Sequence, residues 1–310
     1  MLTANPRDPE THRQTHIAER DTASDHEHIV LQARDVRFDW AQLPVHYVPG
    51  EPFATHFCNV LHLLLPAGEE FFVEVFKQAL PLIRDEQLRR DVQGFIGQEA
   101  IHSQAHAGVV DHFAARGIDL SPFTDQIRWL FEKLLGDRPR WSVRRQRAWL
   151  VERVALVAAV EHYTAILGEW ILQTPAHDAI GTDPVMLDML RWHGAEEVEH
   201  KAVAFDVMKH LQAGYLRQVR TQLLVTPLML LLWVRGLRFM YSVDPELPAG
   251  TAPRWRDWFA SARRGLVPAP WRFLRVIGAY YRPGFHPSQL GGVEQAVNYL
   301  AVSPAARAAH

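Results

Sequence analysis

The sequence lacks several features that would place a protein in a common class. Its one cysteine, Cys58, excludes a disulfide within the chain and fits a reducing cytoplasm. Sustained alternation of apolar and polar residues is missing, as are Asn-Gly and Asp-Gly turns, so we expect no β-sheet. The net charge of −2 over 310 residues excludes the strongly basic surface that is typical of nucleic-acid binding. We therefore expect a cytoplasmic protein with no nucleic-acid partner.

The sequence also lacks an uninterrupted apolar run of the roughly 20 residues that a membrane-spanning helix needs. Its longest run extends from Leu223 to Val234, contains Thr226 and Pro227, and has arginines on both sides. We favour a buried helix here and keep a segment lying at the inner membrane surface as the alternative. Residues 1–35 are polar, so we expect a disordered tail and no signal peptide.

What the sequence does contain is helical periodicity, with apolar residues at spacings of three and four over most of its length. We expect one helical unit over residues 36–245 and a Pro-, Trp- and Arg-rich helical appendage over 246–310. The stretch Leu65-Pro66-Ala67-Gly68 predicts a break between two helices. The expected helices cover residues 53–64, 69–82, 86–116, 122–135, 142–173 and 184–212.

One short motif, Glu-x-x-His, occurs twice on predicted long helices. Its first copy is Glu99 with His102, and its second is Glu197 with His200. Residues three apart share a face of a helix, so each copy brings a carboxylate and an imidazole to one point. Because both helices are apolar elsewhere, these points are expected to lie in the core. A single copy is weak evidence in a chain with 17 histidines, but two copies are much stronger.

A helix with a candidate glutamate precedes each motif. The candidates are Glu69 or Glu70 before the first copy and Glu161 before the second. A glutamate from each of two helices and Glu-x-x-His from two others is the ligand layout of dinuclear centres in helical bundles. Four glutamates in an apolar core would be very unfavourable without cations. The sequence therefore predicts an all-α, ferritin-like four-helix bundle with a dinuclear metal centre and a C-terminal helical appendage.

Other charged residues and histidines lie near the two motifs. His193 and His106 continue the stripes of the motif residues, so each is a ligand or supports one. We expect Glu196 and Glu199 to face outward, and Asp206 either to support a ligand histidine or to lie at the surface. The histidines at 56, 62 and 162 are expected to be structural.

Three stretches resemble a known bacterial family. They are LPAGE at 65–69, FIGQEAIH at 95–102 and RWHGAEEVEHK at 191–201. Over about residues 36–245 the chain looks like the family labelled predicted metal-dependent hydrolase, which is similar to ferritin-like di-iron proteins. The resemblance implies Glu69 rather than Glu70. The spacing of His193, Glu197 and His200 also resembles the ligand pattern of di-iron arylamine N-oxygenases. The predicted ligands are thus Glu69, Glu99, His102, Glu161, His193, Glu197 and His200, with His106 left open.

Carboxylates and imidazoles suit iron, and also manganese or zinc. We favour two irons that activate O2 to hydroxylate, desaturate or N-oxygenate an apolar substrate. A dinuclear metal-dependent hydrolase is the first alternative, although Gly-x-Ser-x-Gly, His-Glu-x-x-His and His-x-x-Glu-His patterns are missing. Non-catalytic iron storage or scavenging is the second. We expect a small-molecule or lipid-like substrate, and leave open an electron donor, a peripheral membrane contact and a homodimer.

Overall fold

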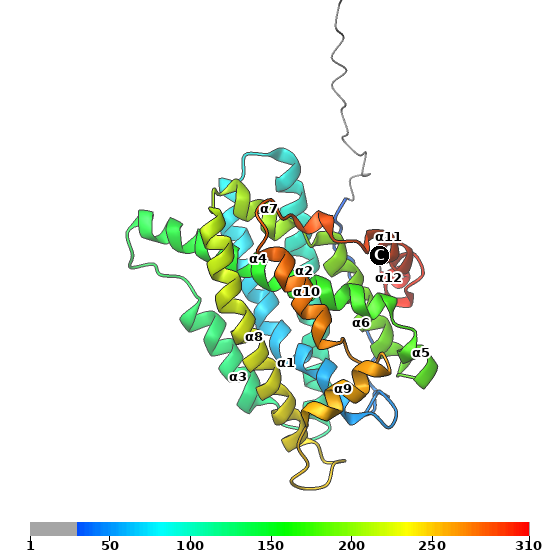
Figure 1. Cartoon of the computed structure of the whole chain (residues 1–310). Helices are drawn as coiled ribbons and strands as arrows, with labels where there is room; N and C mark the ends of the chain where they lie inside the picture. The colour runs from blue at the N-terminus through cyan, green and yellow to red at the C-terminus, as the bar shows by residue number, and fades with distance from the viewer. Residues whose placement is uncertain (1–29, 310) are drawn as a thin grey trace, which may run out of the picture.

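The computed structural model describes residues 30–309, which form helices and no strand (Figure 1). Four long helices carry the residues of interest: α1 (Pro52–Ala79), α2 (Glu86–Ala115), α4 (Val143–Gln173) and α6 (Pro184–His200). Helix α1 packs on α2, and α4 packs on α6 and α1. The remaining α-helices are α3 (Ser121–Trp129), α5 (Ala176–Ile180), α7 (Val203–His210), α8 (Tyr215–Val243), α9 (Trp255–Arg263), α10 (Pro270–Tyr280), α11 (Val293–Leu300) and α12 (Pro304–Ala308).

Local sequence explains where two of the long helices begin. The side chain of Asp85 accepts a hydrogen bond from the backbone N–H of Leu88 and so caps α2. Asp183 caps α6 in the same way and is followed by Pro184, which suits the first turn. Apolar residues then join the helices. The rings of Phe76 in α1 and Phe95 in α2, for example, are fully buried with centroids 4.7 Å apart.

The chain before α1 lies against α2. A Cβ atom on Gly94 would come within 2.5 Å of the Leu31 carbonyl oxygen, and one on Gly97 within 2.7 Å of Ala33 Cβ. Only glycine at these positions lets the two backbones approach so closely. The predicted disordered tail falls outside the described residues as far as residue 29. Its last residues contact the protein, and they bring Arg34 to α6.

Two predicted helix boundaries are wrong. Helix α1 runs without a break through Pro66, where we expected two helices. Proline disfavours a helix interior by about 3 kcal/mol, but burial of this stretch against α2 outweighs that cost. Conversely, the expected helix over 184–212 is two helices with a turn at Lys201 and Ala202. The Lys201 ammonium group donates to the carbonyls of Leu290 and Gly291, contacts that helical periodicity cannot reveal.

The expectation of a buried helix over Leu223–Val234 is also wrong. These residues lie within α8, which packs on α1 and α4 but leaves much of its apolar surface exposed. Only 28% of the most apolar 18-residue stretch of α8 is buried. Within the described chain α8 is the one helix long and apolar enough to cross a membrane, a test that core helices of soluble proteins also pass. The exposed leucines are Leu216, Leu223, Leu224, Leu228, Leu230 and Leu231.

Candidate metal centre

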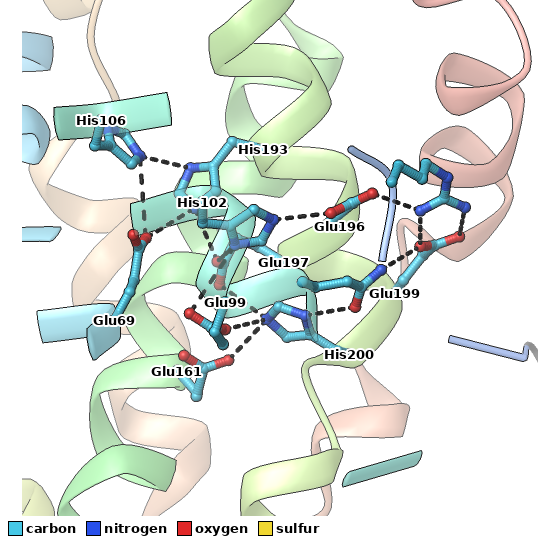
Figure 2. Close-up of polar contacts among 12 residues, drawn as sticks. Glu69, Glu99, His102, His106, Glu161, His193, Glu196, Glu197, Glu199 and His200 are labelled. Atoms are coloured by element: carbon cyan, nitrogen blue, oxygen red, sulfur yellow. Dashed lines mark hydrogen bonds and ion pairs between the residues drawn. The ribbon is translucent and has the colours of Figure 1, made fainter. Parts of the chain in front are cut away.

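The structure brings the seven predicted ligand residues together in the interior. Helix α1 supplies one of them, α2 two, α4 one and α6 three. All are buried, and their side chains converge in Figure 2. They form two groups of potential ligand atoms that each lie within 4.8 Å of one another. The first group is Glu69, His102, His193 and Glu197; the second is Glu99, Glu161, Glu197 and His200.

Glu197 belongs to both groups. Its Oε1 atom lies 2.9 Å from His193 Nε2 and 3.4 Å from His102 Nδ1 in the first group. Its Oε2 atom lies 3.4 Å from His200 Nε2 in the second. The two oxygens of one carboxylate therefore face different groups, as in a carboxylate that bridges two cations.

The other glutamates complete the two groups. In the first, Glu69 Oε1 lies 3.3 Å from His193 Nε2. In the second, Glu99 Oε1 and Glu161 Oε2 each lie 3.1 Å from His200 Nε2. Each imidazole thus turns one nitrogen toward carboxylate oxygens of its group.

Most of these inward-facing atoms have no hydrogen-bond partner. In residues 30–309 this holds for both carboxylate oxygens of three glutamates, for one oxygen of the fourth, and for one nitrogen of each histidine. Buried polar atoms are rarely left in this state, because each loses its hydration without compensation. One cation within each group would satisfy these atoms. The atoms are Glu69 Oε1 and Oε2, Glu99 Oε1 and Oε2, Glu161 Oε1 and Oε2, Glu197 Oε2, His102 Nδ1, His193 Nε2 and His200 Nε2.

The electrostatics of the cluster point the same way. Burial, followed by the charges of Glu197 and Glu99, raises the pKa of Glu161 to about 8. Burial also raises the pKa of Glu69 well above its ordinary value. The protein alone therefore favours protonation of these two carboxyls near neutral pH. Cations in the cluster would favour the ionised carboxylates instead.

The second nitrogen of each histidine is held from outside the cluster. Glu196 Oε2 lies 2.9 Å from His102 Nε2 (Figure 2). Gln98 Oε1 lies 3.0 Å from His200 Nδ1. Such outer contacts fix the orientation of a ligand ring and its tautomer. Burial alone would lower the pKa of His102, but the nearby Glu196 and Glu197 carboxylates outweigh it and raise that pKa to about 9.

The expectation that Glu196 and Glu199 face outward is wrong. Glu196 is fully buried and also binds Arg34 at 2.6 Å. The Glu199 side chain is 3% exposed and pairs with Arg34 and with the Gln98 amide. Glu196 lies three residues after His193, so helical spacing placed it on the ligand stripe, and we overlooked this. Gln98 lies four residues before His102 and so has the same kind of helical spacing, whereas Arg34 carries no such pattern because it reaches the cluster through tertiary packing.

The remaining predicted residues occupy varied positions. His106 belongs to neither group: its Nε2 contacts His193 Nδ1 at 3.4 Å, and its Nδ1 contacts His62 at 2.7 Å. Asp206 pairs with His286 rather than with a ligand histidine. Glu70 is exposed while Glu69 is buried, in agreement with the choice between them.

The two other histidines expected to be structural have partners outside the cluster. The buried His162 contacts the Val276 carbonyl at 2.9 Å. His56 and His46 both contact the buried Asp244 carboxylate, at 2.7 and 2.5 Å, and tie the chain before α1 to the end of α8. The contact of His162 agrees with a structural role, whereas His46, His56 and Asp244 also form a third group of potential metal-ligand atoms.

A family model described as "Predicted metal-dependent hydrolase" matches residues 32–291. The chain belongs to this family. The same comparisons find no match among curated proteins or solved structures. The family match extends beyond the 36–245 that we expected and includes α9 and α10. Much of the region that we called an appendage is therefore part of the family's shared sequence.

The family is described as metal-dependent, and the two buried groups of ligand residues in this chain are able to hold metal ions. One face of the cluster is open to a small cavity of about 30 Å³, lined by His193 and Glu197. The other lining residues are almost all apolar and come from α1, α4, α6 and α8; Thr164 is an exception. A molecule that approaches the centre on this side therefore meets an apolar wall.

The helices can approach one another closely beside the centre. A Cβ atom on Gly194, next to His193, would lie 2.8 Å from Gly168 Cα and from an Ile171 methyl group. Likewise, a Cβ on Gly168 would lie 2.3 Å from the Gly194 carbonyl oxygen. This pair of glycines lets α4 and α6 cross at the level of the cluster, and larger residues would separate Glu161 from the α6 ligands.

Proposed function

We propose that this chain is a metal-dependent hydrolase with a dinuclear centre. The observation that carries the proposal is the sharing of Glu197 between two buried groups of four ligand residues. Membership of a family described as metal-dependent hydrolases supports the reaction class. The seven ligands would be Glu69, Glu99, His102, Glu161, His193, Glu197 and His200.

The arrangement of the ligand-bearing helices supports a ferritin-like four-helix bundle. Helices α1 and α4 each supply one glutamate, while α2 and α6 each supply Glu-x-x-His. This is the division of ligands found in carboxylate-bridged bundles. His193, also on α6, brings the number of imidazoles to three, and its Nε2 atom lies 2.9 Å from Glu197 Oε1.

Two bound divalent ions would lower the pKa of a water molecule and polarise a scissile bond. The residues of the chain would hold this chemistry in place. Glu197 would set the spacing of the two positions, since one oxygen faces each. Glu196 and Gln98 orient two of the histidines. The apolar wall beside His193 would keep bulk water away from the reacting group.

A second candidate is oxidation of an organic substrate by O2 at two irons. The apolar lining of the small cavity favours this candidate, because it suits a hydrocarbon substrate. Apart from the ligands His193 and Glu197, Thr164 is the one lining residue with a hydroxyl group that could bind a polar substrate. A carboxylate-rich donor set with histidines also suits iron, although manganese and zinc accept the same donors. This reaction would require an electron donor, which stays a prediction.

Metal counting and two activity assays separate these candidates. We expect two metal ions per chain and, for hydrolysis, release of p-nitrophenol from p-nitrophenyl esters of acyl chains without O2 consumption. Consumption of O2 by the Fe(II)-loaded protein, with no ester cleavage, would replace hydrolysis by the second candidate. A protein that binds no metal would refute both.

A further inference from the structure

A second, larger cavity lies between α8, α9 and α10. Figure 1 shows these three helices near one another. Its volume of about 360 Å³ is within the range of small-molecule sites. The walls are mostly aromatic and aliphatic side chains, including Met229, Phe273 and Ile277. Such a lining recognises hydrocarbon rather than polar groups.

The larger cavity adjoins the small cavity at the metal centre. Phe57, Leu167 and Trp233 line both of them. These three side chains therefore form the wall between the hydrocarbon-lined space and the cavity that His193 and Glu197 line. The indole N–H of Trp233 is buried and has no hydrogen-bond partner in the part of the chain that the structure describes.

Two arginines give the larger cavity a positive charge. Arg238 of α8 and Arg254, just before α9, line it, and both are exposed. Neither has an ion-pair partner among the described residues, whereas nearby Arg264 pairs with Glu51. Arginine binds carboxylates well because its planar group offers two parallel donors. The cavity thus combines an apolar interior with two cations available for an anion.

We propose that this cavity binds a long-chain carboxylate, with the carboxylate at Arg238 and Arg254 and the aliphatic chain directed toward Trp233. The buried end of the chain would then face the metal centre across the Phe57–Leu167–Trp233 wall. A substrate of the proposed hydrolase would in addition carry a hydrolysable bond, such as an ester, at this buried end, and that catalytic meaning rests on the proposed function. Binding itself does not depend on that function.

The first experiment titrates the purified full-length protein with cis-parinaric acid, a fluorescent long-chain carboxylate. We expect cis-parinaric acid to bind saturably and to be displaced by dodecanoate. Dodecanol should displace it about tenfold less well, because the alcohol lacks the charge that the arginines recognise. This factor corresponds to about 1.4 kcal/mol. Equal displacement by both would overturn the role of the arginines. A lack of saturable binding would overturn the whole proposal.

Two sets of variants locate the site. Arg238→Gln with Arg254→Gln should weaken dodecanoate about tenfold without changing dodecanol, while Arg256→Gln, a neighbouring arginine outside the cavity lining, should change neither. Ile277→Trp fills the cavity and should weaken both ligands, in contrast to Leu216→Trp on the exposed face of α8. Unchanged binding in the double arginine variant and in Ile277→Trp would place the site elsewhere.

A third variant tests the wall, and metal analysis separates this proposal from the proposed function. Trp233→Ala should join the two cavities and shift the preferred carboxylate to a longer chain; an unchanged preference would show that the chain does not extend toward the centre. Metal content is measured in every variant. Carboxylate binding without metal would refute the proposed function alone, and two metals without carboxylate binding would refute this inference alone.

Discussion

Two regions of the molecule reverse the usual distribution of polar and apolar residues. One is the interior between α1, α2, α4 and α6, and the other is the outer face of α8, α9 and α10. The interior holds the four predicted ligand glutamates, whose inward oxygens mostly have no hydrogen-bond partner among residues 30–309. The outer face exposes leucines and tryptophans, including Leu224, Trp255 and Trp271. Both arrangements are unfavourable for a chain selected for stability alone. Each therefore points to a ligand: cations inside, and hydrocarbon at the outer face.

The difference also shows how the two regions are held in place. The interior cluster is supported by directional contacts, such as Glu196 with His102, that fix single atoms. The cavity between α8, α9 and α10 is lined mostly by apolar side chains, which pack without directional hydrogen bonds. A substitution in the interior should therefore act on metal binding, while one on the outer face should act on apolar ligands and leave the metals in place.

The largest effect is expected for Glu197. Glu197→Gln removes the carboxylate that both groups share, so the protein should lose both metals, as measured by elemental analysis of dialysed protein. Glu99→Gln should lose the metal of the second group. Glu70→Gln, one residue from Glu69 but exposed, is the matched control and should retain both. Retention of two metals by Glu197→Gln would show that the two groups do not share a ligand.

A smaller effect is expected where the cluster meets its outer contacts. Arg34→Gln leaves the buried Glu196 carboxylate without its cation and should disturb the orientation of His102. Loss of such contacts lowers metal affinity by about 10–100-fold, which competition with a chelator measures. Arg37→Gln, an exposed change nearby, should leave the affinity unchanged. Equal affinities for the two variants would remove Arg34 from the site.

The close crossing of α4 and α6 predicts a change in stability. Gly194→Ala forces the helices apart beside His193 and should lower the free energy of unfolding by about 1–3 kcal/mol, measured by denaturant titration. Gly278→Ala in α10 meets no atom within 4 Å and should raise stability by up to about 1 kcal/mol. If both variants behaved alike, the crossing would be less tight than the structure shows.

The buried carboxyls predict a pH dependence of the metal-free protein. The pKa of Glu161 is raised to about 8 in the folded state, so folding binds its proton more tightly than the unfolded chain does. This contribution is fully present below the ordinary pKa of a glutamate, about 4.3, and is lost as the pH rises toward 8, by up to about 1.4 kcal/mol per unit. The midpoint temperature of thermal unfolding of the metal-free, chelator-treated protein should therefore fall more steeply over this pH range than that of Glu161→Gln. Parallel curves would contradict the shift.

The smallest effect on the fold is expected at the outer face. Leu223→Gln with Leu224→Gln changes two exposed side chains and should alter stability by less than about 0.5 kcal/mol, with both metals retained. The predicted peripheral membrane contact would weaken instead, so less protein should float with vesicles that contain phosphatidylglycerol. If the unaltered protein does not float with such vesicles, the membrane contact is refuted.

Much of the candidate centre was predictable because helical spacing is local. The two Glu-x-x-His motifs and His193 share faces of α2 and α6 wherever those helices pack. The choice of Glu69 over the exposed Glu70 rested on a resemblance, and burial agrees with it. The role of Glu196 was missed, although its spacing from His193 was visible. Continuity of α1 through Pro66 was not predictable, because packing overrides the local preference of proline.

The sequence by itself determined the helical character, the stripes of carboxylates and imidazoles, and the residues able to bind metal, since these follow from periodicity and side-chain chemistry. The tertiary structure alone decided that Glu197 faces both groups, that Arg34 reaches Glu196, and that α8 leaves an apolar face exposed beside a cavity. The physical reason is distance along the chain. Arg34 and Glu196 are separated by 162 residues, and no local preference encodes a contact made only when four helices converge.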